Sequence, residues 1–291
     1  MESITLNHQE NSRENTIEMV DFYNEATEDY AFRSKDLNMH FGYYRPFLNN
    51  PFRRNTMLNE MNHQVLKRLN LPKNKASLVD LGCGVGGTMR YALKKIKGIT
   101  TFGVTLSPFQ VQKGNALLKH LKGSILLENY NHTSFKSNTF DGALAIESFC
   151  HSGHDKHSFK EAYRILKPNG RFVIADAFLK KETSKLCYGS KYAYKKLCSH
   201  WSLERLASIE TVKKDLTNLG FKNIKVEDVS FRVAPSVLHV PFAITGFILK
   251  KIFTLQSLKR ESLHNLKGSF YALLSGLHMK SFGYYLISCT K

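Results

Sequence analysis

A glycine-rich turn behind a short apolar strand is the part of this sequence best suited to hold a nucleotide. Residues 78–88 read LVDLGCGVGGT, so an acid, Asp80, stands in front of the glycines. Glycines let the backbone turn through positive φ and let a ligand lie against bare peptide. The N–H groups at the start of the following helix can face a polar ligand group. Gly82, Gly84 and Gly87 also fit the dinucleotide spacing G-x-G-x-x-G, so the glycines alone do not decide which nucleotide binds.

The charges around the turn separate two nucleotide classes. A dinucleotide site needs an acid about 20 residues further on, at the end of the second strand, for the ribose hydroxyl. Here the expected second strand, residues 101–104, is followed by Thr105 and Leu106, with no carboxylate. Asp80 would repel a pyrophosphate and attract a cation such as a sulfonium carrying an ammonium. The sequence therefore disfavours a dehydrogenase and predicts a cationic nucleotide.

A second candidate group follows the apolar stretch 140–146. Glu147 stands at its end, and His151 follows about one helical turn later. A carboxylate there can accept a proton or stabilise a cation, and the histidine can share the proton or orient the carboxylate. The simpler alternative is that Glu147 only hydrogen-bonds its own loop. His151, His154 and His157 lack the usual spacing of metal ligands, so no metal site is predicted.

Three segments resemble the class I S-adenosylmethionine-dependent methyltransferases, most closely the tocopherol and sterol C-methyltransferases. They read LVDLGCGVGG, GVTLSPFQ and AIESFCH. In the last segment the subgroup has a glutamate followed four residues later by a histidine, which are Glu147 and His151 in this chain. The similarity covers roughly residues 75–176 and is nearly absent from 179–280.

The resemblance implies S-adenosylmethionine as the cofactor and a set of residues in contact with it. Asp80 would bind the methionine moiety, Thr105 would border the ribose in place of an acid, and Asn129 would replace an aspartate at the adenine amine. An aromatic lid over the donor would come from Tyr23, Tyr30, His40 and Tyr43, although these residues could equally pack a helix on the sheet. The full donor set is Asp80, Gly82, Cys83, Gly84, Thr105, Leu106, Gln110, Asn129, Tyr130 and Ile146, with the four lid residues.

The resemblance also implies the reaction. Methylation of an alkene or aromatic carbon leaves a carbocation, which must be stabilised by π faces or a carboxylate and then lose a proton. Glu147 would do both, on an isoprenoid-like or other apolar molecule of natural product biosynthesis. An O- or N-methyltransferase of a small natural product or lipid headgroup stays open, with Glu147 as an ordinary base. A binding protein built on the same fold is the third alternative, and the intact glycine turn argues against it.

The order of apolar and amphipathic segments predicts the elements that position these residues. Strands alternating with helices indicate an α/β fold with a doubly wound, mostly parallel sheet. The resemblance adds seven strands, an antiparallel last strand and a helical cap. Strands are expected at 77–81, 100–105, 124–128, 140–146, 171–176, 221–229 and 283–290, and helices at 55–69, 87–96, 108–120, 157–166 and 208–219.

The chain divides into three expected parts. Residues 1–15 form a loose polar tail and 16–70 a helical lid. Residues 71–291 form the Rossmann-like methyltransferase domain, with cap insertions at about 179–207 and 231–280. Both insertions are expected over the carboxyl ends of the strands, where open α/β sheets bind ligands.

The two insertions carry the features that would select an acceptor. Their aromatic side chains suit an apolar molecule. Basic residues after the apolar stretch 237–249 could meet an anionic membrane surface, hold a diphosphate, or form the solvated face of an ordinary helix. The aromatic residues are Tyr192, Tyr194, Trp201, Phe231, Phe242, Phe247 and Phe253, and the basic ones are Lys250, Lys251, Lys259 and Arg260.

Composition limits the partners and the location. The 291 residues carry a formal charge of +18, although the first 30 hold eight acids and one base. The basic residues are diffuse and accompany no nucleic-acid module, so an apolar, optionally phosphorylated small molecule is favoured as the partner over nucleic acid. Five unclustered cysteines and a polar start without a signal peptide predict a cytoplasmic protein. The stretch 237–249 is too short to cross a bilayer, and the oligomeric state stays open.

Overall fold

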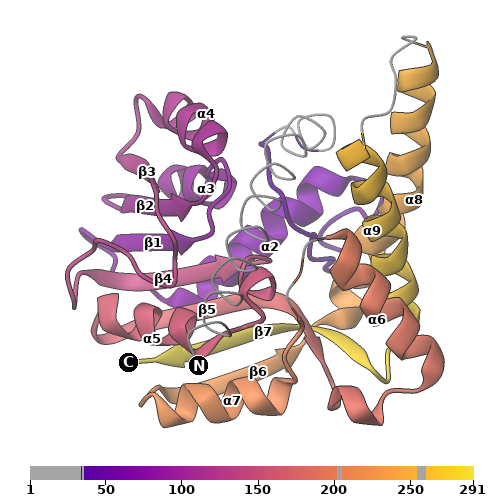
Figure 1. The fold of residues 1–291 in the computed structure, drawn as a ribbon. Helices are drawn as coiled ribbons and strands as arrows, with labels where there is room; N and C mark the ends of the chain where they lie inside the picture. The colour runs from indigo at the N-terminus through magenta and orange to yellow at the C-terminus, as the bar shows by residue number, and fades with distance from the viewer. Residues whose placement is uncertain (1–33, 35, 202, 204, 254–259) are drawn as a thin grey trace, which may run out of the picture.

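The computed structural model describes residues 34, 36–201, 203, 205–253 and 260–291. Its centre is a seven-stranded sheet of order β3-β2-β1-β4-β5-β7-β6, with helices against both faces (Figure 1). The predicted α/β, doubly wound sheet is confirmed. The strands are β1 Ser77–Leu81, β2 Thr100–Thr105, β3 Gly123–Leu127, β4 Phe140–Ile146, β5 Leu166–Leu179, β6 Lys222–Asp228 and β7 Phe282–Thr290.

The last strand inserts between the fifth and sixth and runs antiparallel to both. β5 was expected only over 171–176, but β7 pairs with it from Arg171, opposite Thr290, to Leu179, opposite Phe282. This partner extends β5 beyond the apolar segment that the sequence marks. The same pairing sets Tyr284 opposite Ala177, which matters for the site below.

The helices begin close to where the sequence predicts. Ser107 caps α4, with its Oγ accepting the Gln110 amide at 3.1 Å, and Pro108 occupies the first turn. Asp155 caps α5 in the same way. The helix expected from Thr16 lies outside the described residues. The helices are α2 Arg54–Leu69, α3 Gly87–Lys95, α4 Pro108–Leu118, α5 Lys156–Ile165, α6 Tyr188–His200, α7 Ile209–Asn218, α8 Ser230–Phe253 and α9 Arg260–Leu277, with 3₁₀ turns at Phe149–Ser152 and Thr183–Lys185.

Two apolar cores hold the helices to the sheet. On one face, Phe159 of α5 and Val212 of α7 are fully buried against the strands. On the other face, Val65 of α2, Ala92 of α3 and Val233 of α8 fill a second core. Burial of such side chains is the main stabilising contribution to this layered arrangement.

Three helices form a cap at one end of the sheet: α6, α8 and α9 (Figure 1). Leu197 of α6 packs there with Leu206 and with Phe282 at the start of β7. A Cβ at Gly268 of α9 would lie 2.1 Å from the Trp201 ring, so the absence of a side chain lets the helix approach that ring. Among the described helices, none is both long and apolar enough to cross a membrane.

Candidate functional site

The glycine turn after β1 is built as its residue types require. The φ angles of Gly82, Gly84 and Gly86 are 91°, 54° and 74°, all in the left-handed region that favours glycine. The N–H groups of Gly82 and Cys83 both donate to the Val104 carbonyl at 3.0 Å, which ties the turn to β2. A Cβ at Gly82 would lie 2.4 Å from the Cβ of Ser148, so no other residue fits there.

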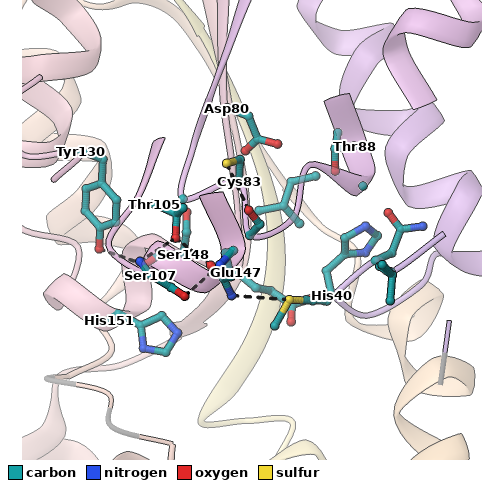
Figure 2. A pocket seen from close by; sticks show the side chains of 18 of the residues that line it. His40, Asp80, Cys83, Thr88, Thr105, Ser107, Tyr130, Glu147, Ser148 and His151 are labelled. Carbon is teal, nitrogen blue, oxygen red and sulfur yellow. Dashed lines mark hydrogen bonds between the residues drawn. The ribbon is translucent and has the colours of Figure 1, made fainter. Parts of the chain in front are cut away.

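A cavity of about 840 Å³, counted with its open mouth, lies over this turn (Figure 2). We call it the glycine-turn cavity. Most of the residues predicted for donor binding and catalysis line it, although they come from five separate segments. Its walls are Leu37, Asn38, Met39, His40, Asp80, Gly82, Cys83, Gly84, Gly87, Thr88, Thr105, Leu106, Ser107, Gln110, Tyr130, Ile146, Glu147, Ser148 and His151.

Asp80 is the buried acid of this cavity. Its side chain is almost wholly removed from bulk water, and burial raises the pKa of its carboxyl to about 8. A cation bound beside it would favour the charged form. The Cys83 thiol nearby stays protonated because burial and the Asp80 charge raise its pKa well above the usual value.

His40 fastens the segment 37–41 over the cavity. Its Nδ1 lies 2.8 Å from the Phe41 carbonyl, and its Nε2 lies 3.0 Å from Asn62 Oδ1, which also accepts from the Thr88 hydroxyl at 2.9 Å. Burial lowers the pKa of His40 to about 4, so the ring is neutral at pH 7. A neutral ring carries a single N–H, so His40 donates to one of these two oxygens and contributes no charge.

The far wall is formed by the ends of β2 and β4. Thr105 donates from Oγ1 to Gln110 Oε1 at 2.6 Å. Tyr130 donates from its hydroxyl to the Ser148 carbonyl at 3.0 Å, and burial raises the pKa of that phenol, so it stays protonated. Ser148 in turn donates from Oγ to the Leu81 carbonyl at 2.6 Å. These bonds hold the cavity wall in one arrangement.

Glu147 lies directly after β4 with a φ of 49°, unusual for a side chain of its size. Its Oε1 accepts the Phe41 amide at 2.7 Å and the Tyr284 hydroxyl at 2.8 Å. Despite these two donors, burial raises the pKa of the carboxyl to about 8. A positive φ and a shifted pKa in a cavity make Glu147 a candidate for a functional carboxylate.

A second cavity of about 830 Å³ adjoins the first below the cap. We call it the cap cavity. It shares Met39, His40, Glu147 and His151 with the glycine-turn cavity, so the two meet at the catalytic candidates. Its remaining walls are mainly apolar and aromatic: Phe41, Arg54, Cys150, Asp176, Ala177, Leu197, Trp201, Leu203, Leu206, Val240, Ser269 and Tyr284.

The cap cavity holds a second buried carboxylate, which the sequence reading missed. Asp176 accepts the Cys150 amide at 3.0 Å and the Ala177 amide at 2.8 Å. Behind it, His154 Nε2 lies 3.3 Å from Asp176 Oδ2. The Ala207 amide donates to His154 Nδ1 at 3.4 Å, which leaves the proton of a neutral ring on Nε2, facing the carboxylate.

The three neighbouring histidines have separate environments. His151 lines both cavities, His154 is fully buried against Asp176, and the His157 side chain is 74% exposed beside Asp155. In the described part of the chain, no group of three His, Cys, Asp or Glu side chains could hold a metal.

Two residues predicted for the donor site lie away from both cavities. The Tyr43 amide donates to the Met57 carbonyl at 2.8 Å, and its ring packs on the core beneath α2. The exposed Asn129 folds back to accept the Asn131 amide at 2.9 Å in a local turn. Tyr23 and Tyr30 lie outside the described residues.

Three residues that line the cavities were not predicted as site residues. The sequence identified Ser107 only as a helix cap, and no local pattern indicated Asp176 or Tyr284. Tyr284 is 137 positions from Glu147, and only the antiparallel pairing of β7 with β5 brings its hydroxyl there. Of the aromatic cap residues, Trp201 lines the cap cavity, whereas the described rings of Phe231 and Phe242 point to the surface, 78% and 77% exposed.

The sheet order and the acid-fronted glycine turn define the class I methyltransferase fold. A solved geranyl diphosphate C-methyltransferase from Streptomyces coelicolor A3(2), with Mg²⁺, geranyl diphosphate and S-adenosyl-L-homocysteine bound, superposes with a TM-score of 0.70. The two are 18% identical, and the alignment covers 95% of this chain and 97% of that one. The profile of the family described as "Methyltransferase domain" matches residues 79–174.

The sequence relatives include sterol and tocopherol methyltransferases. A sterol 24-C-methyltransferase of Kluyveromyces lactis is 27% identical over 218 residues, which are 72% of this chain and 57% of that protein. The "Probable tocopherol O-methyltransferase, chloroplastic" of Oryza sativa subsp. japonica is 27% identical over 228 residues, 75% and 61% of the two chains. The chain thus spans about 57–61% of the length of these relatives. The chain is similar to class I S-adenosylmethionine-dependent methyltransferases, with sterol and tocopherol methyltransferases among its sequence relatives.

Proposed function

We propose that the protein transfers a methyl group from S-adenosylmethionine to an alkene or aromatic carbon of an isoprenoid-like or other apolar molecule. The observation that carries the proposal is the position of Glu147, whose carboxyl stands where the glycine-turn cavity meets the cap cavity. A donor in the first cavity and an acceptor in the second would react beside this carboxylate.

The glycine-turn cavity fits the donor by its chemistry. The glycine turn has no side chain at Gly82, where a Cβ would clash with Ser148, or at Gly84, whose φ is positive. A ligand can therefore lie directly against the peptide backbone there. Asp80 supplies a carboxylate suited to a cationic donor, and Thr105, Leu106 and the other donor-site residues that line this cavity supply the wall for its nucleoside. When bound, the donor supplies an electrophilic methyl on a sulfonium.

We propose that the part of residues 16–70 that precedes α2 acts as a lid on this cavity, whereas α2 itself is packed in the core. Met39 and His40 already form part of its wall, and His40 is fixed through Asn62 to Thr88 at the start of α3. A lid excludes water, which strengthens electrostatic interactions inside the site.

The cap cavity suits an apolar acceptor that becomes positively charged. Phe41 and Trp201, with ring centroids 6.4 Å apart, and Tyr284 present aromatic faces to it. Aromatic faces attract cations, and the Glu147 and Asp176 carboxylates lie on the same wall. A carbocation formed here would be stabilised on more than one side.

Glu147 then removes the proton. As the acceptor carbon bonds to the methyl group, the carbon–sulfur bond breaks, its electron pair stays on sulfur, and the positive charge moves to the acceptor. Loss of a C–H proton to the carboxylate then restores a neutral double bond or aromatic ring: the proton leaves a carbon beside the cation in an alkene, and the methylated carbon itself in an aromatic ring. A base with a pKa of about 8 holds this proton at neutral pH and releases it to water afterwards.

An oxygen or nitrogen acceptor is the second candidate. The rice relative is named as an O-methyltransferase, and Glu147 in the same position would take a hydroxyl proton. A phosphorylated acceptor, like the geranyl diphosphate bound by the Streptomyces enzyme, would find Arg54 as the one Lys or Arg among the described walls of the cap cavity.

The experiment supplies labelled S-adenosylmethionine with a panel of sterols, tocopherol precursors and prenyl diphosphates. Mass spectrometry identifies any product that gains one methyl and the atom that carries it. Glu147→Gln should abolish turnover while S-adenosylhomocysteine still raises its melting temperature. Glu210→Gln, at an exposed position of α7, is the matched control and should behave as wild type. Full turnover by Glu147→Gln, or methyl on oxygen or nitrogen alone, contradicts the proposed base or the proposed atom.

A further inference from the structure

Large apolar side chains are exposed to solvent on two segments, the loop before α2 and the cap helix α8. The first segment is the loop before α2, where Phe47 and Phe52 are 104% and 85% exposed. The second is α8, where exposed apolar residues recur at positions 231, 238 and 242. These spacings of seven and four keep the three side chains on one side of a helix. We call the whole set the apolar rim: Phe47, Leu48, Phe52, Phe231, Leu238 and Phe242.

The two segments are joined into one surface. His239 Nε2 of α8 lies 2.6 Å from the Pro51 carbonyl of the loop. The Tyr44 amide donates to the Arg232 carbonyl at 2.7 Å, nearer the start of α8. In helical projection, position 242 falls between 238 and 239, so Phe242 emerges beside the contact with the loop. The rim is therefore one patch and not scattered single residues.

The charge of these segments identifies the partner. Residues 41–59 and 230–253 contain no acid and six basic residues: Arg45, Arg53, Arg54, Arg232, Lys250 and Lys251. Of the described side chains, those of Arg53 and Arg232 are exposed next to the rim. Protruding Phe and Leu side chains flanked by cations suit the interface of an anionic bilayer. A second copy of the chain would bring like charges together, which disfavours self-association through this face.

The same two segments also wall the cap cavity. Phe41 comes from the loop, Arg54 begins α2 directly after it, and Val240 comes from α8. We propose that the apolar rim inserts into the headgroup region of an anionic membrane and sets the cap cavity against the bilayer. An apolar acceptor would then enter the site from the lipid without crossing water. This last step, but not membrane binding itself, rests on the proposed function.

The test measures binding of the whole chain to sedimenting vesicles. Wild type should bind vesicles of phosphatidylcholine with phosphatidylserine, and it should bind pure phosphatidylcholine vesicles more weakly. The double variant Phe47→Ser/Phe52→Ser should lower the partition coefficient about tenfold or more, because two apolar side chains no longer enter the lipid. The matched control is Leu117→Ser/Leu127→Ser, on α4 and β3, where the two side chains are 43% and 53% exposed. This control should bind as wild type.

Two results would overturn the proposal. One is that wild type and Phe47→Ser/Phe52→Ser bind the vesicles equally well, or that neither binds them. The other is a wild-type dimer in light scattering that the same variant dissociates, which would make the rim an interface between copies. A melting shift with S-adenosylhomocysteine checks that each variant is folded. Since vesicle binding needs no methyl acceptor, its failure leaves the proposed function standing, and an absence of methyl transfer leaves the membrane proposal standing.

Discussion

The Tyr284 hydroxyl offers the sharpest test of how the site controls its base. Tyr284→Phe removes the donor that lies 2.8 Å from Glu147 Oε1, while the ring and the Phe41 amide bond remain. A hydrogen bond to a charged group contributes roughly 1.5–3 kcal/mol. Since one pKa unit corresponds to about 1.4 kcal/mol, the pKa of Glu147 should rise by about 1–2 units from its starting value of about 8.

The sign of the effect follows from the form that reacts. Glu147 must be a carboxylate to accept the proton, and a higher pKa leaves less carboxylate at pH 7. Turnover at pH 7 should therefore fall about 10- to 100-fold, in step with the shift of 1–2 units. The loss should shrink as pH rises past the new pKa. The assay is kcat/KM for the acceptor against pH, at saturating S-adenosylmethionine, with the acceptor found by the labelling experiment.

Tyr285→Phe is the matched control. Tyr285 is the next residue of β7 and faces the opposite core, where burial and the neighbouring Asp228 carboxylate raise the pKa of its phenol. Its substitution should leave the pH profile unchanged. A Tyr284→Phe profile that superposes on wild type, or that is lowered equally at every pH, would refute the positioning role.

Three further predictions concern the buried acids and the turn. Asp80→Asn should lower the affinity for S-adenosylmethionine about tenfold or more. The affinity for S-adenosylhomocysteine should fall less, because only S-adenosylmethionine carries the sulfonium charge. Calorimetry should also show the wild-type affinity for S-adenosylmethionine rising with pH through about 8, the pKa of Asp80. Gly82→Ala should lower the free energy of unfolding by roughly 2 kcal/mol or more, measured in urea, because the new Cβ would clash with Ser148; wild-type stability would contradict the tight turn. Burial of Glu147 raises its pKa from 4.5 to about 8, so its contribution to stability is full below about pH 4.5 and is lost as pH rises through about 8. Glu147→Gln should flatten that dependence in urea titrations, and an unchanged slope would mean that the carboxyl is not buried in solution.

Local sequence signals predicted the parts of the fold that depend on neighbours in the chain. The apolar run before Asp80, the glycines after it and the Ser-Pro start of α4 all appear where expected. The length of β5 could not be predicted in this way: residues 177–179 join it by pairing with β7, more than a hundred residues later, and at its other end Leu166 pairs with Phe140 of β4. The position of β7 between β5 and β6 likewise depends on long-range pairing.

The site residues likewise fall into those that local signals predict and those that depend on long-range pairing. Asp80, Gly82 and Glu147 lie at ends of strands, so a strand prediction was enough to bring them to one edge. Asn129 was assigned by family position, but its own Asx turn directs the side chain to solvent. Tyr284 and Asp176 occupy strand positions whose facing is set by the register of β5 and β7, which no local pattern reveals.

The Phe41 amide that holds Glu147 has a consequence for the timing of proton transfer. Phe41 directly follows Met39 and His40, which form part of the wall of the glycine-turn cavity. If this segment moves outward to exchange nucleosides, the hydrogen bond from the Phe41 amide to the Glu147 carboxylate breaks as well. Opening would also admit water to the carboxyl, and since burial is the main cause of its raised pKa, an opened enzyme would release the proton more readily than a closed one. The carboxylate would therefore reach its full basicity only with the nucleoside enclosed.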